Sequence, residues 1–158
     1  MILPNKISHA SASLKGGEAL TIRPVTAQIL EAYAAVLSQL APVNLDLAGI
    51  MKAYGRLLVI PDLWPFAGLV NDHVISCATL FCEPKLIREG RFAGRIEDVV
   101  VDAAWRGKHV GEAMILHLVN VARFVGCRKI TLSCADANVG FYTRCGFRPH
   151  EHSMRLDL

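Results

Sequence analysis

The stretch that most constrains the fold runs from residue 99 to residue 111, VVVDAAWRGKHVG. It opens with three consecutive valines (99–101), an apolar β-branched run typical of a buried strand. A basic loop containing Gly107 follows, and apolar residues at helical spacing begin at Val110. At the start of such a helix, free backbone N–H groups and the helix dipole favour an anion. The stretch therefore predicts a phosphate-binding loop between a strand and a helix.

The bulk composition bounds what surrounds this loop. The chain has 158 residues, of which 53% are hydrophobic and 20% charged, and this is enough to form a buried core. A net charge of +3, without a long basic run, is a weak bias toward anionic ligands and argues against nucleic acid as a partner. No apolar run reaches the ~20 residues that cross a bilayer, so we expect no membrane partner.

The cysteine pattern indicates neither a disulfide framework nor a metal site. The chain contains an odd number of cysteines, without a paired CxxC motif and without a histidine cluster at metal-ligand spacing. No secretory signal is recognisable at the start, so we expect a cytoplasmic protein with reduced thiols and no metal. The cysteines are Cys77, Cys82, Cys127, Cys134 and Cys145.

The N-terminal third predicts a loose extension followed by a strand and two helices. Residues 1–18 have no apolar period, so the sequence predicts an extension before a single domain over 19–158. A strand is predicted over 19–23. The helix that follows is expected to start at a Thr26 cap and to run to Leu40. A second helix is predicted over 47–54, capped by Asp46 and ended by Gly55.

The remainder alternates strands with helices. Strands are predicted over 57–60, 67–71 and 74–81, with a hydrophobic turn over 61–66. After the loop come a helix over 110–125 ended by Gly126, a strand over 129–134, a helix over 138–144 and a strand over 152–156. This order predicts an α/β (α+β) fold with a mixed sheet and helices on both faces.

The loop carries a resemblance to a known superfamily. Arg106 and Gly111 fit the signature Arg/Gln-x-x-Gly-x-Gly/Ala of the GNAT acetyltransferases, whereas His109 stands where the first glycine is usual. The resemblance implies the GNAT fold, with a mostly antiparallel central sheet, and acetyl-CoA as the co-substrate.

Further segments resemble the glucosamine 6-phosphate N-acetyltransferases within that superfamily. These segments are IEDVVV (96–101), GCRKITL (126–132), NVGFYTRCGF (138–147) and KLIR (85–88). The resemblance implies direct acetyl transfer to glucosamine 6-phosphate in a ternary complex, on the route to UDP-N-acetylglucosamine. It also implies a homodimer with a shared active site.

The same resemblance assigns roles to individual residues. Tyr142 would stabilise or protonate the leaving thiolate, and Glu97 and Asp98 would hold the sugar hydroxyls and the amine. The cofactor-binding set comprises Val99, Val100, Val101, Arg106, Gly107, Lys108, His109, Val110, Gly111, Glu112, Asn138 and Tyr142. The acceptor-binding set comprises Ser38, Lys85, Leu86, Ile87, Arg88, Glu97, Asp98, Arg128, Lys129, Ser133 and Arg155.

Two positions depart from the pattern of that family. Ser133 stands where an aspartate is expected, and a serine can accept a hydrogen bond from the amine but carries no charge. Asp157 stands where a basic residue is expected, which leaves Arg155 for the phosphate.

Two alternatives stay open at this point. The acceptor could be another small amine or a protein amine, in which case the basic phosphate set would lose its purpose. The chain could also be a catalytically silent CoA-binding domain, a hypothesis that His109 and Ser133 favour and that Tyr142, Glu97 and Asp98 oppose.

Overall fold

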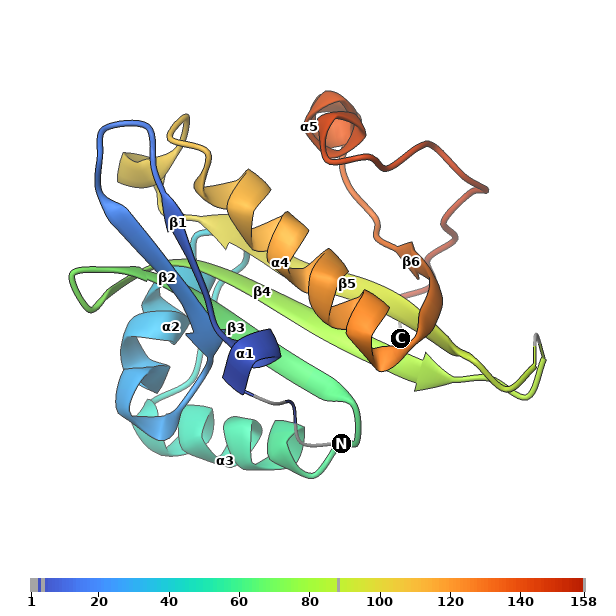
Figure 1. The fold of residues 1–158 in the computed structure, drawn as a ribbon. Coiled ribbons are helices and arrows are strands. Elements are labelled where there is room, and N and C mark those ends of the chain that lie inside the picture. Colours follow the sequence, from blue (N-terminus) through green and yellow to red (C-terminus); the bar gives the residue numbers. More distant parts are fainter. Residues whose placement is uncertain (1–2, 4, 88, 158) are drawn as a thin grey trace.

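The fold is built on one six-stranded sheet. A computed structural model describes residues 3, 5–87 and 89–157, and Figure 1 shows their arrangement. The elements are α1 (Asn5–Ser8), β1 (Ala10–Ser13), β2 (Ala19–Pro24), η1 (Ala27–Ile29), α2 (Leu30–Leu37), α3 (Leu47–Leu58), β3 (Leu63–Val70), β4 (His73–Pro84), β5 (Phe92–Val101), η2 (Ala103–Trp105), α4 (Val110–Val125), β6 (Cys127–Thr131), η3 (Asp136–Asn138) and α5 (Val139–Arg144).

The strands lie in the sheet in sequence order, from β1 to β6. The first five pair antiparallel with their neighbours, and β6 pairs parallel with β5. A parallel pair needs a crossover, which α4 supplies between the two strands. The predicted mixed, mostly antiparallel sheet with helices on both faces is confirmed.

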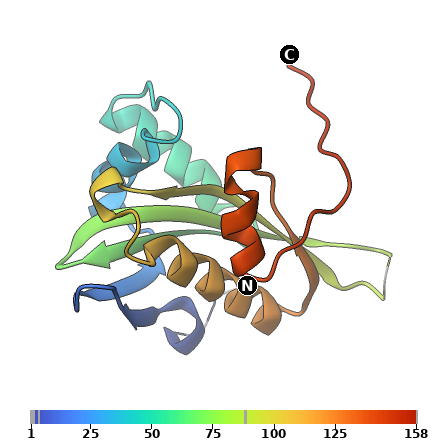
Figure 2. The ribbon, with the colours of Figure 1, turned by 90° about the horizontal axis from the view of Figure 1, so that it is seen from above.

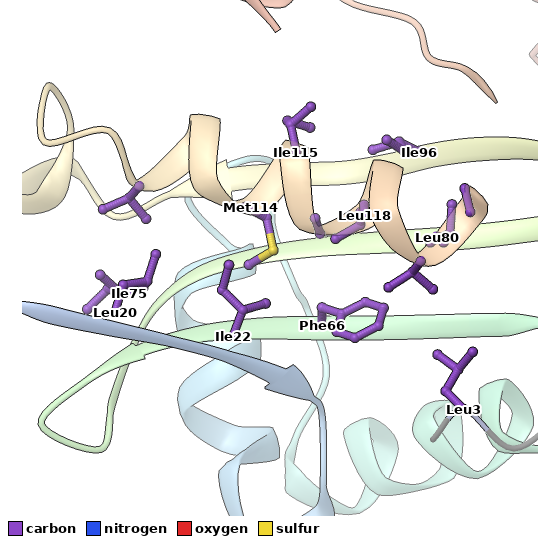
Figure 3. Close-up of a cluster of buried hydrophobic side chains, with 14 of the residues drawn as sticks. Leu3, Leu20, Ile22, Phe66, Ile75, Leu80, Ile96, Met114, Ile115 and Leu118 are labelled. Carbon is purple, nitrogen blue, oxygen red and sulfur yellow. The ribbon is translucent and has the colours of Figure 1, made fainter. Parts of the chain in front are cut away.

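Helix α4 covers one face of the sheet. Its Met114, Ile115 and Leu118 have almost no exposed surface and pack on apolar side chains from several strands. Figure 3 shows these residues above Ile22 and Phe66. Burying a side chain of this size contributes roughly 1.5–3 kcal/mol, so this contact fixes α4 and the loop before it on the sheet.

Helices α2 and α3 cover the opposite face (Figure 1). Tyr33 and Val36 of α2 pack with Ala67 and Cys77 in a second buried cluster. Tyr54 of α3 adds a hydrogen bond, because its hydroxyl donates to the Val25 carbonyl at 2.8 Å.

Three local predictions are confirmed. Helix α4 spans residues 110–125, and Gly126 ends it with a positive φ of 90°, where its N–H bonds to the Ala122 and Arg123 carbonyls. Asp46 caps α3, because its carboxylate accepts from the Gly49 N–H at 2.8 Å. The strand predicted over 19–23 is β2.

The expectation of a loose extension over residues 1–18 is wrong for residues 5–13. These residues form α1 and β1, and β1 pairs in register with β2. The sequence did not reveal this strand, because ASAS alternates alanine with serine, and small residues such as alanine are depleted in strands and give a weak apolar signal. Leu14, just after β1, is buried in the core.

The strand predicted over 57–60 and the helix stop at Gly55 are also wrong. Helix α3 continues through Gly55 to Leu58, and Val59 and Ile60 lie exposed beyond it. A run of four apolar residues fits a helix as well as a strand, and a glycine inside a helix is tolerated at about 1 kcal/mol.

The hydrophobic turn predicted over 61–66 is confirmed for residues 61–62, whereas residues 63–66 form the first half of β3, in which Phe66 is fully buried. Pro65 argued against a strand because it lacks an N–H. It is accommodated where the pairing with β2 ends, since its carbonyl accepts from the Val25 N–H at 2.9 Å.

Two further predictions fail at the ends of elements. The helix expected to reach Leu40 ends at Leu37, and Thr26 makes no side-chain capping bond. Residues 152–156 form no strand, because no other strand of the described chain lies beside them. Figure 2 shows this C-terminal segment extending away from the sheet.

Candidate active site

Strands β5 and β6 separate after a short paired stretch. Their pairing covers only Phe92–Arg95 and Cys127–Thr131. Among the described residues, the stretch from Ile96 to Val101 therefore has no strand on its β6 side, and β6 leads away toward α5 (Figure 1). Backbone N–H and C=O groups on a strand edge need partners, so this edge can bind an extended ligand in the manner of an added strand.

A β-bulge interrupts β5 at Asp98. Cys77 pairs with Val100 and Thr79 pairs with Glu97, so two β5 residues, Asp98 and Val99, stand opposite one residue of β4. Asp98 has a positive φ of 56°. Bulges of this kind re-aim side chains and are enriched at active sites. Desolvation raises the pKa of Asp98, with a further contribution from the neighbouring Glu97.

Glu97 and Asp98 lie inside β5, because the strand begins at Phe92 and not at the three valines with which the sequence analysis opened it. Glu97 forms an ion pair with Arg95, a basic residue that the sequence interpretation did not single out. The three valines lie on alternating faces, with Val99 and Val101 against the α4 core and Val100 in the α2 cluster.

The loop that joins β5 to α4 is held in a strained, specific shape. Gly107 and His109 both have positive φ angles, 75° and 67°. The Arg106 Nε donates to the Val101 carbonyl at 3.1 Å, which ties the loop to the end of β5. His109 occupies the N-cap of α4 without a capping bond to the helix. The left-handed backbone explains why glycine is usual at this position.

The first turn of α4 begins where the sequence predicts the anion-binding groups. Val110 is buried at its start, Gly111 follows, and Glu112 lies 2.9 Å from His109 Nδ1. Since the first N–H groups of a helix have no partner inside it, this end suits a phosphate group.

Lys108 is restrained by two neighbours. Its Nζ lies 3.1 Å from Glu18 Oε1 in the β1–β2 connection and 4.4 Å from the centre of the Trp105 ring. Hydrogen bonds from its own backbone and from Lys108 lower the pKa of Glu18, which keeps the pair charged. The connection after β1 therefore supports the loop, a contact that the sequence did not indicate.

Helix α5 packs against the N-terminus of α4. Phe141 contacts the α4 core, and Tyr142 lies half-buried between the Phe141 and Phe147 rings, with ring centres 4.9 and 6.1 Å away. Burial is the main cause of a raised pKa for Tyr142, and Cys134 and Cys145 contribute further. A phenol is protonated at neutral pH even at its ordinary pKa, and burial favours that form further, so Tyr142 can donate a hydrogen bond.

Asn138 stands at the N-cap of α5, where an asparagine side chain would be expected to cap the helix, but it makes no capping hydrogen bond. The preceding 3-10 turn satisfies the backbone instead, because the Asn138 N–H bonds to the Ala135 carbonyl at 2.8 Å.

A pocket of about 1000 Å³ lies between β6, α5 and the C-terminal segment. Four residues of the predicted site line it together: Arg128, Lys129, Ser133 and Tyr142. The sequence interpretation missed further basic residues of its wall, which come from β5, α4 and the C-terminal segment: Arg95, Arg123, Arg148, His150 and His152. Asp136 and Glu151 also line it, so the wall is predominantly basic.

The rest of the predicted acceptor set lies elsewhere. Lys85, Leu86 and Ile87 are in the β4–β5 connection, at the end of β5 that is ~30 Å from Val101 by strand length. Lys85 pairs with Glu83 at 2.5 Å. Arg88, from the same segment, lies outside the described residues.

Ser38 and Arg155 also stand apart from the pocket. The Ser38 hydroxyl donates to the Ala35 carbonyl at 2.7 Å, at the end of α2. Arg155 is exposed in the C-terminal segment and pairs with Asp157 at 2.5 Å.

Across residues 3, 5–87 and 89–157, no three His, Cys, Asp or Glu side chains gather as metal ligands. None of the helices in those ranges is long and apolar enough to cross a membrane.

Comparisons with known proteins agree with this geometry. The model of the Acetyltransferase (GNAT) family matches residues 47–147. The glucosamine 6-phosphate N-acetyltransferase of Trypanosoma brucei brucei is 37% identical over 123 residues, which cover 77% of this chain and 82% of the relative. Glucosamine 6-phosphate N-acetyltransferase 1 of Oryza sativa subsp. japonica is 33% identical, over 98% of this chain and 96% of the relative.

A solved structure shows the same fold. The crystal structure of an acetyltransferase from Trypanosoma brucei superposes with a TM-score of 0.82 at 31% identity, covering 88% of this chain and 99% of that one. The family match, the relatives and the fold lead to one conclusion: the chain belongs to the acetyltransferase (GNAT) family, and within it is similar to the glucosamine 6-phosphate N-acetyltransferases.

Proposed function

We propose that the protein transfers the acetyl group of acetyl-CoA to the amine of glucosamine 6-phosphate. The observation that carries this proposal is the open edge of β5, which leads to the N-terminus of α4, while Arg95 of the same strand lines the basic pocket. The names of the relatives support the choice of acceptor.

The donor fits the open edge and the loop. GNAT acetyltransferases use acetyl-CoA, whose thioester supplies an activated acetyl group. The edge from Val99 to Val101 would bind the pantetheine arm through backbone groups, while the N–H groups from Gly107 to Glu112 would hold the pyrophosphate. The cradle at Gly111 is tight, because a Cβ there would lie 3.2 Å from Phe141 Cζ and 3.5 Å from Val101 Cγ2.

The acceptor fits between the bulge and the basic pocket. Arg128 and Lys129 would bind the phosphate by charge, and Glu97 with Asp98 would orient the hydroxyls and the amine. The raised pKa of Asp98 makes its carboxylate a better base than an ordinary aspartate. This matters because Ser133, on the pocket wall, carries no charge.

Transfer is direct, within a ternary complex. The neutral amine attacks the thioester carbonyl, the C–N bond forms, Asp98 takes the proton that the nitrogen loses, and the C–S bond breaks. Tyr142, whose phenol is protonated at neutral pH, gives its proton to the departing thiolate and regains one through solvent from Asp98. The product, N-acetylglucosamine 6-phosphate, would serve synthesis of UDP-N-acetylglucosamine. The free thiols of the five cysteines fit a cytoplasmic location.

The active unit is a homodimer with a shared site. Within one chain, Lys85 and Arg155 lie apart from the pocket that holds Arg128 and Lys129. The outer edge of β6 pairs with no strand of the described chain, while Met154 and Leu156 of the C-terminal segment lie exposed. A second copy could cover this edge and bring the missing cations.

The acceptor preference tests the proposal. The double variant Arg128→Ala, Lys129→Ala should raise KM for glucosamine 6-phosphate at least tenfold while changing KM for glucosamine little, because only the phosphorylated sugar loses two charge-assisted contacts. Mass spectrometry should identify the N-acetylated phosphosugar as the wild-type product. Equal losses for both sugars would remove these residues from the phosphate site.

A further inference from the structure

The connection after α2 is fastened to the start of the cofactor loop by one side chain. Gln39 Nε2 donates to Asp102 Oδ2 at 2.7 Å, and Gln39 Oε1 accepts from the Ala103 N–H at 3.0 Å. The two residues are 63 positions apart in sequence. Because both ends of the amide are used, and one partner is a carboxylate, this contact fixes orientation as well as distance.

Asp102 has a separate role on its own side of the contact. Its second oxygen, Oδ1, accepts from the Ala104 N–H at 2.9 Å and caps η2, and its N–H donates to the Ile75 carbonyl. The Arg106 side chain ties the same loop to Val101. The loop therefore keeps these hydrogen bonds when the Gln39 side chain is removed, whereas the end of α2 loses its bonds to Asp102 and Ala103.

Helix α2 reaches the bulge that carries the proposed acceptor residues. Tyr33 lies over β4, where its carbonyl accepts from the Cys77 thiol at 3.5 Å. Cys77 pairs with Val100, immediately beyond the bulge at Asp98. Figure 1 shows α2 beneath this part of the sheet. A shift of α2 would therefore move the part of β4 and β5 that positions Asp98.

From these contacts we infer that Gln39 is a positioning residue that couples the acceptor side of the site to the cofactor loop through Asp102. This inference rests on the proposed function. Gln39 holds the α2 end against residues 102–103, so the part of the sheet that α2 covers, with Asp98, and the loop that starts at Asp102 keep one fixed relation when the acceptor binds. Its removal should affect the acceptor more than the donor.

The test exchanges the two hydrogen-bonding roles. Gln39→Glu removes the donor and sets a carboxylate against Asp102, while the bond from the Ala103 N–H is retained. Adding Asp102→Asn restores the contact in reverse, because the new amide can donate to the new carboxylate and its oxygen still accepts from the Ala104 N–H. Gln28→Glu, the same change at an exposed glutamine of η1, is the matched control.

We expect Gln39→Glu to raise KM for glucosamine 6-phosphate about tenfold, the loss of one charge-assisted hydrogen bond. The acetyl-CoA Kd, measured by calorimetry, should change less than about twofold. The double variant should recover KM to within about threefold of wild type, and Gln28→Glu should behave as wild type. A merely structural contact would lower stability without this rescue of KM.

Hydrogen exchange separates this inference from the proposed function. The Ser38 and Ala41 N–H groups, bonded to the Ala34 and Leu37 carbonyls, should exchange faster in Gln39→Glu and return to wild-type rates in the double variant. Wild-type inactivity on glucosamine 6-phosphate would overturn the proposed function. The hydrogen-exchange rates would then test only whether Gln39 holds the end of α2. Unchanged exchange, or an acceptor KM that the double variant does not rescue, would overturn the inference.

Discussion

A Cβ atom at Gly111 would lie 3.2 Å from Cζ of Phe141. The first turn of α4 and the helix that carries Tyr142 therefore meet at a position without a side chain. Contacts this short force the neighbouring ring to move, so the glycine sets how closely the two parts of the site approach each other.

Gly111→Ala should displace α5 by a few tenths of an ångström and lower kcat/KM for acetyl-CoA on the order of tenfold, because small misplacements of reacting groups are costly. Gly140→Ala is the control within α5, since a Cβ there meets nothing nearer than Arg144 Nη1 at 3.9 Å. Steady-state kinetics should show loss in the first variant and none in the second. Wild-type activity in both variants would show that the close packing of Gly111 against α5 does not affect catalysis.

Tyr142→Phe should lower kcat about a hundredfold and leave the acetyl-CoA Kd nearly unchanged, because only the proton donor to the thiolate is lost. Tyr54→Phe is a matched change far from the chemistry, where the lost bond to Val25 should reduce stability by about 1 kcal/mol without lowering kcat. Kinetics and calorimetry measure both effects. Loss of acetyl-CoA affinity in Tyr142→Phe would assign the hydroxyl to binding instead.

His109→Gly should stabilise the protein by roughly 0.5–1 kcal/mol. The left-handed backbone at His109 costs about 1–2 kcal/mol for a residue with a Cβ, which exceeds the entropy that glycine adds to the unfolded chain. His109→Val should have the opposite sign, since a β-branched residue fits this conformation poorly. Chemical denaturation measures both variants, and stabilisation by valine would contradict the strain argument.

Stability should depend on pH through His117. Burial is the main cause that lowers its pKa from 6.5 to about 4, with His9 adding to the shift, while a hydrogen bond to the Ser8 backbone opposes it. The unfolded chain binds this proton below about pH 6.5, and the folded chain binds it only near pH 4. The contribution is therefore full above pH 6.5 and is lost as pH falls toward 4.

The loss from this group should reach about 3 kcal/mol across that window. His117→Leu should flatten the dependence of unfolding free energy on pH in this window, because it removes the titrating group. Leucine should fit the site, since the His117 ring packs against Phe66 with ring centres 5.0 Å apart. Denaturant unfolding between pH 4 and 7 provides the measurement. A variant curve parallel to the wild-type curve would show that another group is responsible.

The features that the sequence predicted well are local. Helix α4, its Gly126 end and the Asp46 cap depend on periodicity and on residues a few positions apart. The β5–α4 loop was identifiable for the same reason, since one continuous stretch contains the strand, the turn and the helix start.

The features that it missed depend on distant contacts. Pro65 is tolerated because β2 stops pairing beside it, and Gln39 matters because Asp102 lies next to it. Arg95 and Arg148 reach one pocket from separate elements. The course of residues 152–156 is not set by local pattern either, since a strand requires a partner strand.

The most direct measurement is release of free thiol from acetyl-CoA with four acceptors: glucosamine 6-phosphate, glucosamine, an amine-bearing peptide and none. Saturable release with glucosamine 6-phosphate, and far weaker release with glucosamine, is the predicted result. It would support the donor edge and the basic acceptor site together. Turnover with the peptide alone, or acetyl-CoA binding without turnover on any acceptor, would contradict the account.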